Sequence, residues 1–341
     1  MDSLISVSYR RGVHIPEAGL WLDPHFASEC AFVSHAHSDH FARHRMTICS
    51  ELTQHIMNVR YGKRAEEAFC AVACGGSVKR DGWKLTLLPA GHIAGSSMLH
   101  LRRDADGASL LYTGDYKLRA SLSCEAARFE QADTLVMEST FALPRYRFPS
   151  RGDVLEQMHT FIQKAFESGA TPLFYAYSLG KAQEVLCALA DSGLSFMLHR
   201  SVWEMTQALR GYLGRLPVFE CFDASKSEGK VLVFPPASKK ASSLRKLKNL
   251  RTAMLSGWAL SPNAKYRYGV DEVIPLSDHA DYTELLETVE LVKPKRVFLV
   301  HGQVQEFAMD LRARGYDAWA LGKHDQMELG FGLSTFGLPE R

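Results

Sequence analysis

The chain has 341 residues, of which 46% are hydrophobic and 23% are charged, an ordinary globular composition with room for more than one structural unit. The net charge of +2 excludes a general attraction to nucleic acid, so any such binding must come from a local basic region. No apolar stretch reaches membrane-spanning length, the N-terminus lacks a signal-peptide pattern, and the seven cysteines form no paired framework. We therefore expect a cytoplasmic protein with reduced thiols and no membrane association.

Short apolar strands separated by turns are predicted in the first part of the chain. They lie at 31–34, 84–90, 97–101, 109–115 and 134–139, with glycine and polar residues at their ends. From about residue 150 the pattern changes to a helix at 151–169, a strand at 171–177 and a helix at 178–193, and strands alternate with helices again over 272–321. This alternation predicts an α/β protein with a parallel sheet in its later part.

Candidate metal ligands lie just past the ends of these strands. The stretch "HAHSDH" places His35, His37, Asp39 and His40 within six residues, directly after an apolar run. Imidazole nitrogens and carboxylate oxygens suit zinc, with manganese or iron as alternatives. Alternating positions let His35 and His37 point at one ion while Asp39 and His40 point at a second. The remaining ligands are expected at other strand ends, where the candidates are His92, Asp115 and His301.

Six motifs in chain order resemble those of a known superfamily. "HAHSDH", "GHIAGS" and "TGDYK" resemble successive motifs of the metallo-β-lactamase superfamily, and "MESTF", "LSDHAD" and "LVHG" resemble the further motifs of its β-CASP nuclease branch. "ESTFALPRYRFP", "AYSLGKAQEVL" and "LSGWAL" extend the likeness to bacterial ligase-associated DNA exonucleases, also described as mRNA 3′-end processing factor-like proteins. The chain departs from the common pattern at Ser38, where alanine is frequent, and at Ala142, where glycine is frequent.

The resemblance implies an αββα metallo-β-lactamase sandwich made of residues 1–148 and 268–341, with a Rossmann-like β-CASP domain inserted at 149–267. It implies an active site in the cleft between the two, holding two divalent ions, Zn²⁺ in preference to Mn²⁺. Under this resemblance one ion is held by His35, His37 and His92, the other by Asp39, His40 and His301, and Asp115 bridges the two.

Three further carboxylates and imidazoles receive roles from the same resemblance. Asp23 in "LWLDP" would orient the loop that carries the metal ligands, and Glu138 and His279 would form a pair beside the scissile phosphate. Two divalent ions about 3.5–4 Å apart suit phosphodiester hydrolysis, because together they activate a water molecule and neutralise phosphate charge. The leaving oxygen needs a proton, and His279 is the candidate acid, kept protonated by Glu138. The predicted catalytic residues are Asp39, as a ligand of the second ion, together with Glu138 and His279.

Substrate-binding residues are predicted in two places. Ser178 and Lys181 lie where a helix begins, whose free amides suit a phosphate, although Ser178 could instead cap the helix and Lys181 could lie in solvent. The stretch 223–251 has eight Lys or Arg against two acids, which suits either backbone phosphates or a solvated face; its candidates are Lys239, Lys240 and Arg245. "RYRFP" at 145–149 could stack an unpaired base or form a hinge.

We predict a metal-dependent nuclease, and the resemblance favours a DNA exonuclease in DNA repair that works with a DNA ligase or helicase. The residue chemistry alone supports phosphodiester hydrolysis but selects neither DNA nor exonuclease action. An RNA-processing nuclease of the same branch is the main alternative. A small-molecule hydrolase of the lactamase type is disfavoured by "LGKAQ" and "SDHAD", and a metal-free nucleic-acid-binding scaffold is disfavoured because every ligand position is filled.

Overall fold

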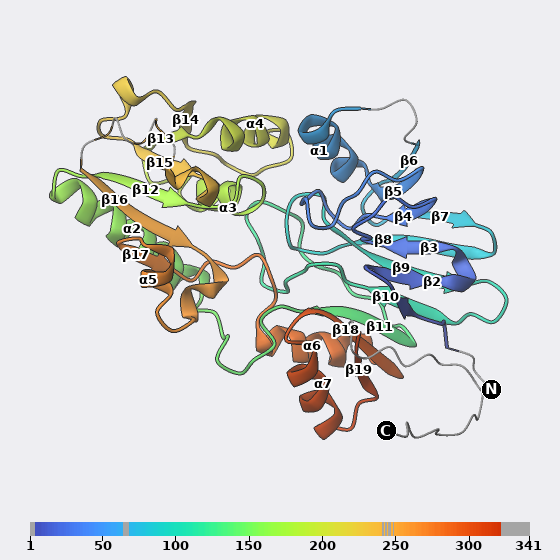
Figure 1. Ribbon diagram of the computed structural model, residues 1–341. Coiled ribbons are helices and arrows are strands. Elements are labelled where there is room, and N and C mark those ends of the chain that lie inside the picture. The colour runs from blue at the N-terminus through green and yellow to red at the C-terminus, as the bar shows by residue number, and fades with distance from the viewer. Residues whose placement is uncertain are drawn as a thin grey trace, which may run out of the picture.

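The computed structural model describes residues 4–63, 68–240, 242, 244, 247 and 249–321. Within these ranges the strands form three sheets, two of which face each other while the third lies apart from them (Figure 1). Over the same residues, no helix combines the length and the apolar character needed to cross a membrane.

The first sheet has six strands in the order β1-β2-β3-β4-β5-β6. Its first three strands pair antiparallel, and β3 to β6 pair in parallel. A helix follows β5 at once, because the side chain of Ser50 accepts a hydrogen bond from the Thr53 amide and caps it. The elements are β1 Ser8–Tyr9, β2 Val13–Ile15, β3 Leu20–Leu22, β4 Cys30–Phe32, β5 Met46–Ser50, α1 Glu51–Tyr61 and β6 Ala68–Val72.

The second sheet has seven strands in the order β19-β18-β11-β10-β9-β8-β7. The strands from β19 to β10 are parallel, whereas β10, β9, β8 and β7 form an antiparallel meander. The strands are β7 Ser77–Arg80, β8 Trp83–Pro89, β9 Ser97–Arg103, β10 Ser109–Tyr112, β11 Thr134–Ser139, β18 Arg296–Gly302 and β19 Ala318–Ala320.

Apolar side chains on alternate faces of these strands build the sandwich. Phe32 of the first sheet and Val136 of the second lie in one core between the sheets. On the opposite face of the second sheet, Leu135 packs with Leu285 of α6 (Tyr282–Val292) and with residues of α7 (Val304–Ala313). Residues of α1 cover the outer side of the first sheet. This helix–sheet–sheet–helix arrangement, here called the sandwich unit, confirms the expected αββα fold.

The third sheet is parallel throughout, in the order β14-β13-β15-β12-β16-β17. Apolar residues of α2, α3 and α4 share one core with one face of this sheet, and α5 lies on the other face. This layered unit, here called the inserted unit, confirms the expected Rossmann-like domain. Its elements are α2 Arg151–Glu167, β12 Thr171–Tyr175, α3 Lys181–Ala188, β13 Ser195–Leu198, α4 Arg200–Leu209, β14 Val218–Cys221, β15 Val231–Phe234, β16 Leu250–Leu255, α5 Ala264–Tyr268 and β17 Glu272–Ile274.

The pairing of β17 bears on where the inserted unit ends. β17 pairs with β16, so it belongs to the third sheet, although a boundary at 268 would assign it to the sandwich unit. The sequence could not show this, because a three-residue strand does not reveal which sheet it joins. We propose that the chain returns to the sandwich unit after Ile274.

Candidate metal centre

Asp23 fixes the loop that follows β4. Its Oδ1 accepts from the amide of Ser34 at 2.7 Å, and its Oδ2 accepts from the Ser34 hydroxyl at 2.6 Å and the Tyr112 hydroxyl at 2.9 Å. The same Oδ2 lies 3.0 Å from Nδ1 of His40. A buried carboxylate with this many partners is rigid, so Asp23 sets the direction of the loop and of the His40 ring.

Three imidazoles converge at the end of that loop. Nδ1 of His37 lies 3.0 Å from Nε2 of His35 and 3.2 Å from Nε2 of His92. The outer nitrogens of two of these rings face backbone carbonyls, His37 Nε2 at 3.1 Å from Leu179 and His92 Nδ1 at 2.9 Å from Asp278. Those contacts put the protons on the outer nitrogens and turn lone pairs toward the common centre.

The arrangement fits a metal ion better than it fits hydrogen bonding. Lone pairs facing each other at 3.2 Å repel unless a cation lies between them. Zinc–nitrogen bonds of about 2.0–2.1 Å would separate tetrahedral ligands by about 3.3 Å, close to the spacing seen here. Burial, followed by the charges of neighbouring imidazoles, holds the pKa of His35 and of His92 well below the usual value, so both rings are in the neutral, metal-binding form.

Asp115 lies beside these imidazoles. Its Oδ2 is 3.7 Å from Nε2 of His35, 3.9 Å from Nε2 of His92 and 3.1 Å from Nε2 of His40. His35, His40 and Asp115 form a second group whose ligand atoms lie within 4.8 Å of one another. One carboxylate oxygen therefore faces both groups, which is the position that a bridging ligand needs.

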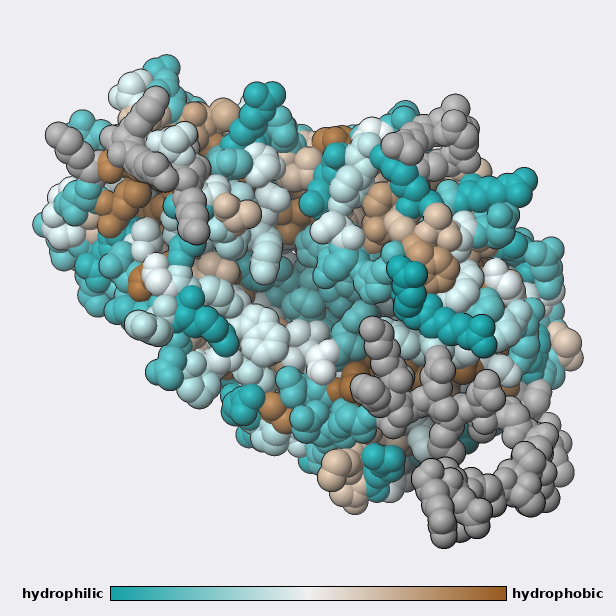
Figure 2. All heavy atoms as spheres, in the orientation of Figure 1, coloured by the Kyte–Doolittle hydropathy of each residue, from teal (hydrophilic) through white to brown (hydrophobic). Residues whose placement is uncertain are grey.

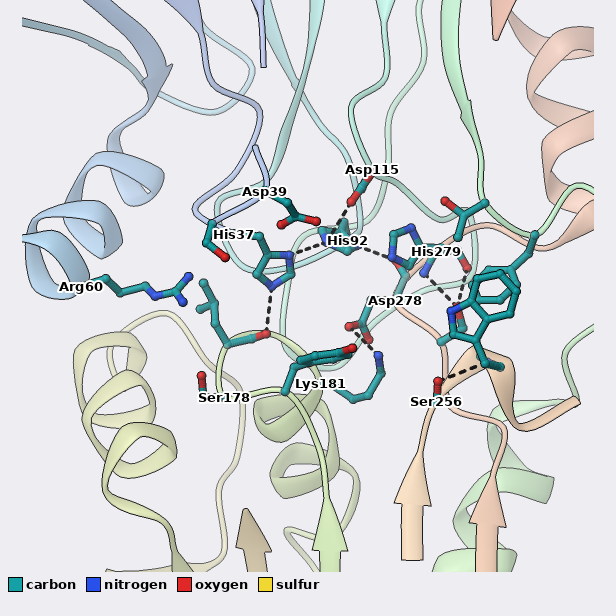
Figure 3. A pocket seen from close by; sticks show the side chains of 18 residues that line it. His37, Asp39, Arg60, His92, Asp115, Ser178, Lys181, Ser256, Asp278 and His279 are labelled. Atoms are coloured by element: carbon teal, nitrogen blue, oxygen red, sulfur yellow. Dashed lines mark hydrogen bonds and ion pairs between the residues drawn. The ribbon is translucent and has the colours of Figure 1, made fainter. Parts of the chain in front are cut away.

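The two remaining predicted ligands lie at the edge of this cluster. His301, at the end of β18, has its ring centroid 5.5 Å from that of His40. Asp39 is exposed and lines the pocket, and it belongs to none of the close ligand groups among the described residues. Figure 3 shows its carboxylate on the same side of the pocket as Asp115. The structure thus brings together five predicted ligands tightly and places His301 and Asp39 next to them.

Glu138 and His279 form a second chemical element of the site. Glu138 ends β11 fully buried, and its Oε2 lies 2.9 Å from Nδ1 of His279. The amide of Tyr116 and the hydroxyl of Thr140 also donate to the Glu138 carboxylate, at 2.8 and 2.5 Å. Burial opposes protonation of His279, but the charges of Glu138 and Asp115 raise its pKa to about 9. A pKa this high favours the protonated form of the His279 ring at neutral pH. The centroid of that ring lies 4.8 Å from that of His92.

A cavity of about 480 Å³ lies over the cluster, between the two units. Figure 2 shows this face hollowed between them, with hydrophilic side chains in the hollow. Arg60 of α1 reaches it from one side and Lys181 from the other (Figure 3). Arg60 also donates to the carbonyl of Ala36, between two of the metal-ligand positions. Phe141, Tyr177 and Trp258 add aromatic walls.

Only some of the predicted substrate-binding residues line the cavity. Lys181 and Ser178 both line the cavity. Lys181 is buried, however, and its Nζ lies 3.1 Å from Oδ2 of Asp278. The N-cap of α3 is Gly180 and not Ser178. Lys239 donates to the carbonyls of Tyr268 and Gly269, so its ammonium is already engaged in the fold. Arg245 and the side chain of Lys240 lie outside the described residues.

The aromatic rings of the segment "RYRFP" are packed against neighbouring side chains. Tyr146 is 2% exposed and contacts the rings of Phe141 and Trp258. Phe148 contacts Phe141, and the guanidinium of Arg119 lies 5.0 Å from its ring centroid. Of the two alternatives, a structured hinge between β11 and α2 agrees with this packing, and stacking of a base on Tyr146 does not.

Sequence reasoning gave no role to Arg60, Tyr177, Trp258 or Asp278, all of which line the cavity. Asp278 precedes His279 in a quoted motif, and its carboxylate was a signal that could have found it, whereas Trp258 lies in another motif and is neither a ligand nor a nucleophile. Arg60 lies in a helix whose sequence carries no motif. Only the meeting of the two units makes these residues neighbours.

The comparisons with known proteins agree with this geometry. Residues 265–321 match the family described as "Zn-dependent metallo-hydrolase RNA specificity domain". A protein named probable DNA ligase from Opitutus terrae is 42% identical over 95% of this chain and 32% of its own length. RNase aCSPSF2 from Saccharolobus solfataricus is 30% identical over 45% of this chain and 32% of its own length. DNA cross-link repair protein SNM1 from Arabidopsis thaliana is 26% identical over 78% of this chain and 59% of its own length.

This chain thus spans about a third to three fifths of the length of those relatives. Among solved structures, a protein of unknown function from Enterococcus faecalis V583 shares the fold, with a TM-score of 0.57 and 16% identity over 82% of this chain and 76% of that one.

The sandwich of two sheets, with imidazoles and carboxylates gathered at the ends of its strands, defines a metallohydrolase. The family match and the relatives narrow this class. The chain belongs to the metallo-β-lactamase superfamily, in its β-CASP branch, a family of metal-dependent hydrolases that includes nucleases.

Proposed function

We propose that this protein is a metal-dependent nuclease that hydrolyses phosphodiester bonds, acting on DNA as an exonuclease in repair. The observation that carries the proposal is the position of the Glu138–His279 pair, whose imidazole lies beside His92 at the floor of a cleft between two units. A hydrolase acting on a small neutral substrate has no need of the cationic side chain of Arg60, which lines the same cleft.

The donor set would hold two divalent ions. His35, His37 and His92 would hold one, His40, Asp39 and His301 the other, and Asp115 would face both. Such ions would supply Lewis acidity, neutralising phosphate charge and lowering the pKa of a water molecule. Zn²⁺ is the first candidate because the imidazole-rich set and the matched family both favour it, and Mn²⁺ is the second.

The protein's own groups complete the reaction. Glu138 occupies Nδ1 of His279, which leaves the Nε2–H of the imidazolium free to give its proton to the leaving oxygen. Arg60 lines the cleft and would attract and orient a phosphate group, whereas the Lys181 ammonium is held by Asp278 at 3.1 Å. Of the aromatic walls, Tyr177 and Trp258 suit contact with nucleotide bases, whereas Phe141 is buried against its neighbours.

The preference for DNA rests on the relatives. The protein from Opitutus terrae is named a probable DNA ligase, and its match to this chain occupies 32% of its length, which supports a working link between this chain and a DNA ligase. The relative from Arabidopsis thaliana is named a DNA cross-link repair protein. RNA remains the second candidate substrate, because the matched family is described by RNA specificity and one relative is named an RNase.

Cleavage of end-labelled single-stranded DNA and RNA of identical sequence, with added Zn²⁺ or Mn²⁺, tests the choice. We expect stepwise shortening of the DNA from one end, absent in an Asp39→Ala, His40→Ala double variant. Preferential shortening of the RNA would transfer the protein to RNA processing. Cuts inside the strand would replace exonuclease by endonuclease action, and cleavage of neither strand would refute the nuclease proposal.

A further inference from the structure

A short helix beside the cleft carries alternating cations and aromatic rings. Helix α5 of the inserted unit contains Lys265, Tyr266, Arg267 and Tyr268 in succession. Tyr266 is 90% exposed, and the flanking Lys265 and Arg267 are exposed as well. The guanidinium of Arg267 lies 5.4 Å from the ring centroid of Tyr268. The charge of Lys265 acts on the carboxylate of Asp271, which follows the helix.

The C-terminal residue of this helix, Tyr268, reaches a side chain that lines the cleft over the metal centre. The hydroxyl of Tyr268 lies 3.3 Å from Oγ of Ser256, and Ser256 lines the cavity. Tyr177 lines the cavity too and is 55% exposed. Burial first, and then the hydroxyl of Tyr268, raise the pKa of Tyr177, as expected for two neighbouring phenols. Tyr177 and the Tyr268 hydroxyl therefore border the cleft, and the exposed Tyr266 lies two residues before Tyr268 on the same short helix.

The helix is held firmly in this position. Asn263 before it and Gly269 after it adopt left-handed backbone conformations, with φ of 58° and 56°. Lys239 donates to the carbonyls of Tyr268 and Gly269 at its C-terminal end, while Val270 is buried in the core beneath. The exposed rings and cations thus project from a supported element, which limits the entropy lost when a ligand binds.

The tyrosines and cations of this surface favour one kind of ligand. Cations attract backbone phosphates, and flat exposed rings stack on bases whose faces are free. In a duplex the base faces are covered by neighbouring pairs, so Tyr266 could contact only the backbone there. In a single strand each nucleotide offers both a phosphate and an open base face.

We propose that Tyr177, Tyr268 and Lys265–Arg267, here called the tyrosine track, bind the part of a single-stranded nucleic acid that extends beyond the bond being cut. This deepens the proposed nuclease function and rests on it for its biological role. The track would make long single strands better substrates than short ones, with little dependence on base sequence.

Binding of a single strand to the metal-loaded protein tests the track directly. The probe is a fluorescent oligothymidylate of roughly twenty nucleotides with phosphorothioate linkages, compared with a duplex of equal length by anisotropy. We expect Tyr266→Ala to weaken single-strand binding roughly fivefold to a hundredfold and to leave duplex binding unchanged. The double variant Lys265→Ala, Arg267→Ala should lower the salt dependence of log affinity by about 1.4, near 0.7 for each lost phosphate contact.

Tyr212→Ala provides the matched control, because Tyr212 is 61% exposed on the same unit but does not line the cavity. If Tyr266→Ala binds the single strand as tightly as this control and the wild type do, the track is refuted. Hydrolysis of bis(p-nitrophenyl) phosphate separates this outcome from failure of the proposed function. A protein that loses single-strand binding in Tyr266→Ala yet never hydrolyses the small diester would keep the track and lose the nuclease proposal.

Discussion

Nδ1 of His279 lies 2.9 Å from Oε2 of Glu138, although 141 residues separate the two in the chain. Glu138 ends a central strand of the sandwich unit, and His279 lies in the segment on which the chain returns from the inserted unit. The two therefore meet only if the whole inserted unit folds between them. This makes the proton donor of the proposed reaction sensitive to the integrity of both units.

Glu138→Gln should change the pH dependence of the reaction. The substitution keeps an oxygen that accepts a hydrogen bond but removes the negative charge, so the pKa of His279 should fall from about 9. A general acid works below its pKa and fails as pH rises through it. The alkaline limb of kcat against pH should therefore move to lower pH. An alkaline limb identical to that of the wild type would contradict the pairing.

His279→Asn should be the more severe change at this pair. Loss of a general acid lowers kcat by roughly a hundredfold to ten-thousandfold, and KM should change little. Glu156→Gln on α2 serves as a control for both variants, because Glu156 is an exposed carboxylate away from the cleft. Retention of full kcat in His279→Asn would show that the leaving oxygen receives its proton elsewhere.

Asp23→Asn should weaken metal binding although Asp23 is not placed among the ligands. An amide cannot accept hydrogen bonds at both of its ends, so the contacts to Ser34, Tyr112 and His40 would not all survive. Such supporting partners typically contribute about tenfold to a hundredfold to metal affinity. Competition with a chromogenic chelator measures the change.

Asp133→Asn is the matched control for that experiment. Asp133 also accepts from a serine amide and hydroxyl, those of Ser109, but at the opposite end of the strands that carry the site. Equal metal affinity in Asp23→Asn and Asp133→Asn would refute a specific role for Asp23.

Gly180→Ala should disturb the contact between the two units. Gly180 has φ of 90°, and an added Cβ would overlap Cγ2 of Ile93, the residue that follows His92. Gly193 has φ of 71° and open space around it, so Gly193→Ala experiences only the backbone strain. We expect Gly193→Ala to cost about 1–2 kcal/mol and Gly180→Ala to cost about 1–3 kcal/mol more in urea unfolding. Equal losses of unfolding free energy in the two variants would show that the contact between Gly180 and Ile93 accommodates an added Cβ.

Lys181→Met should leave a buried charge without a partner. Lys181 pairs with Asp278 at 3.1 Å, and both side chains are almost fully buried. Breaking such a pair typically costs about 3–5 kcal/mol, whereas replacing both members is far milder. The double variant Lys181→Met, Asp278→Asn should therefore regain most of the unfolding free energy. A double variant as unstable as the single one would contradict the pairing.

The same pair predicts a pH dependence of stability. Burial opposes ionisation of Asp278, but the Lys181 charge lowers its pKa from 3.8 to about 2. The stabilisation is thus present above the unfolded pKa of 3.8 and is lost as pH falls through about 2. In Lys181→Met the unfolding free energy should lose this acid dependence, which chemical unfolding at a series of pH values measures.

Sequence patterns predicted which imidazoles and carboxylates would lie together, because these side chains are close in the chain or follow apolar strands. His35, His37 and His40 lie in one loop, and His92 and Asp115 end neighbouring stretches of one sheet. What the sequence could not show are contacts between residues that are far apart in the chain. The carbonyl of Leu179 meets His37 across 142 residues, and that of Asp278 meets His92 across 186.

Charge patterns were a weaker guide than ligand patterns. The basic stretch 223–251 pointed to Lys239, whose ammonium instead holds the end of α5. Lys230 and Arg251 of the same stretch are paired with Glu220 and Glu272. A run of lysines and arginines does not show which of them have partners elsewhere in the fold, because those partners come from distant strands.

We propose that the clustered imidazoles and carboxylates hold metal ions that make this chain a nuclease. The most direct measurement adds Zn²⁺ in steps to chelator-treated protein and follows both bound zinc and hydrolysis of single-stranded DNA. We expect activity to appear as two equivalents of zinc bind. The double variant His37→Ala, His92→Ala should lose one equivalent of bound zinc together with the activity. Hydrolysis that persists without metal, or two bound equivalents that give no cleavage of DNA or RNA, would contradict it.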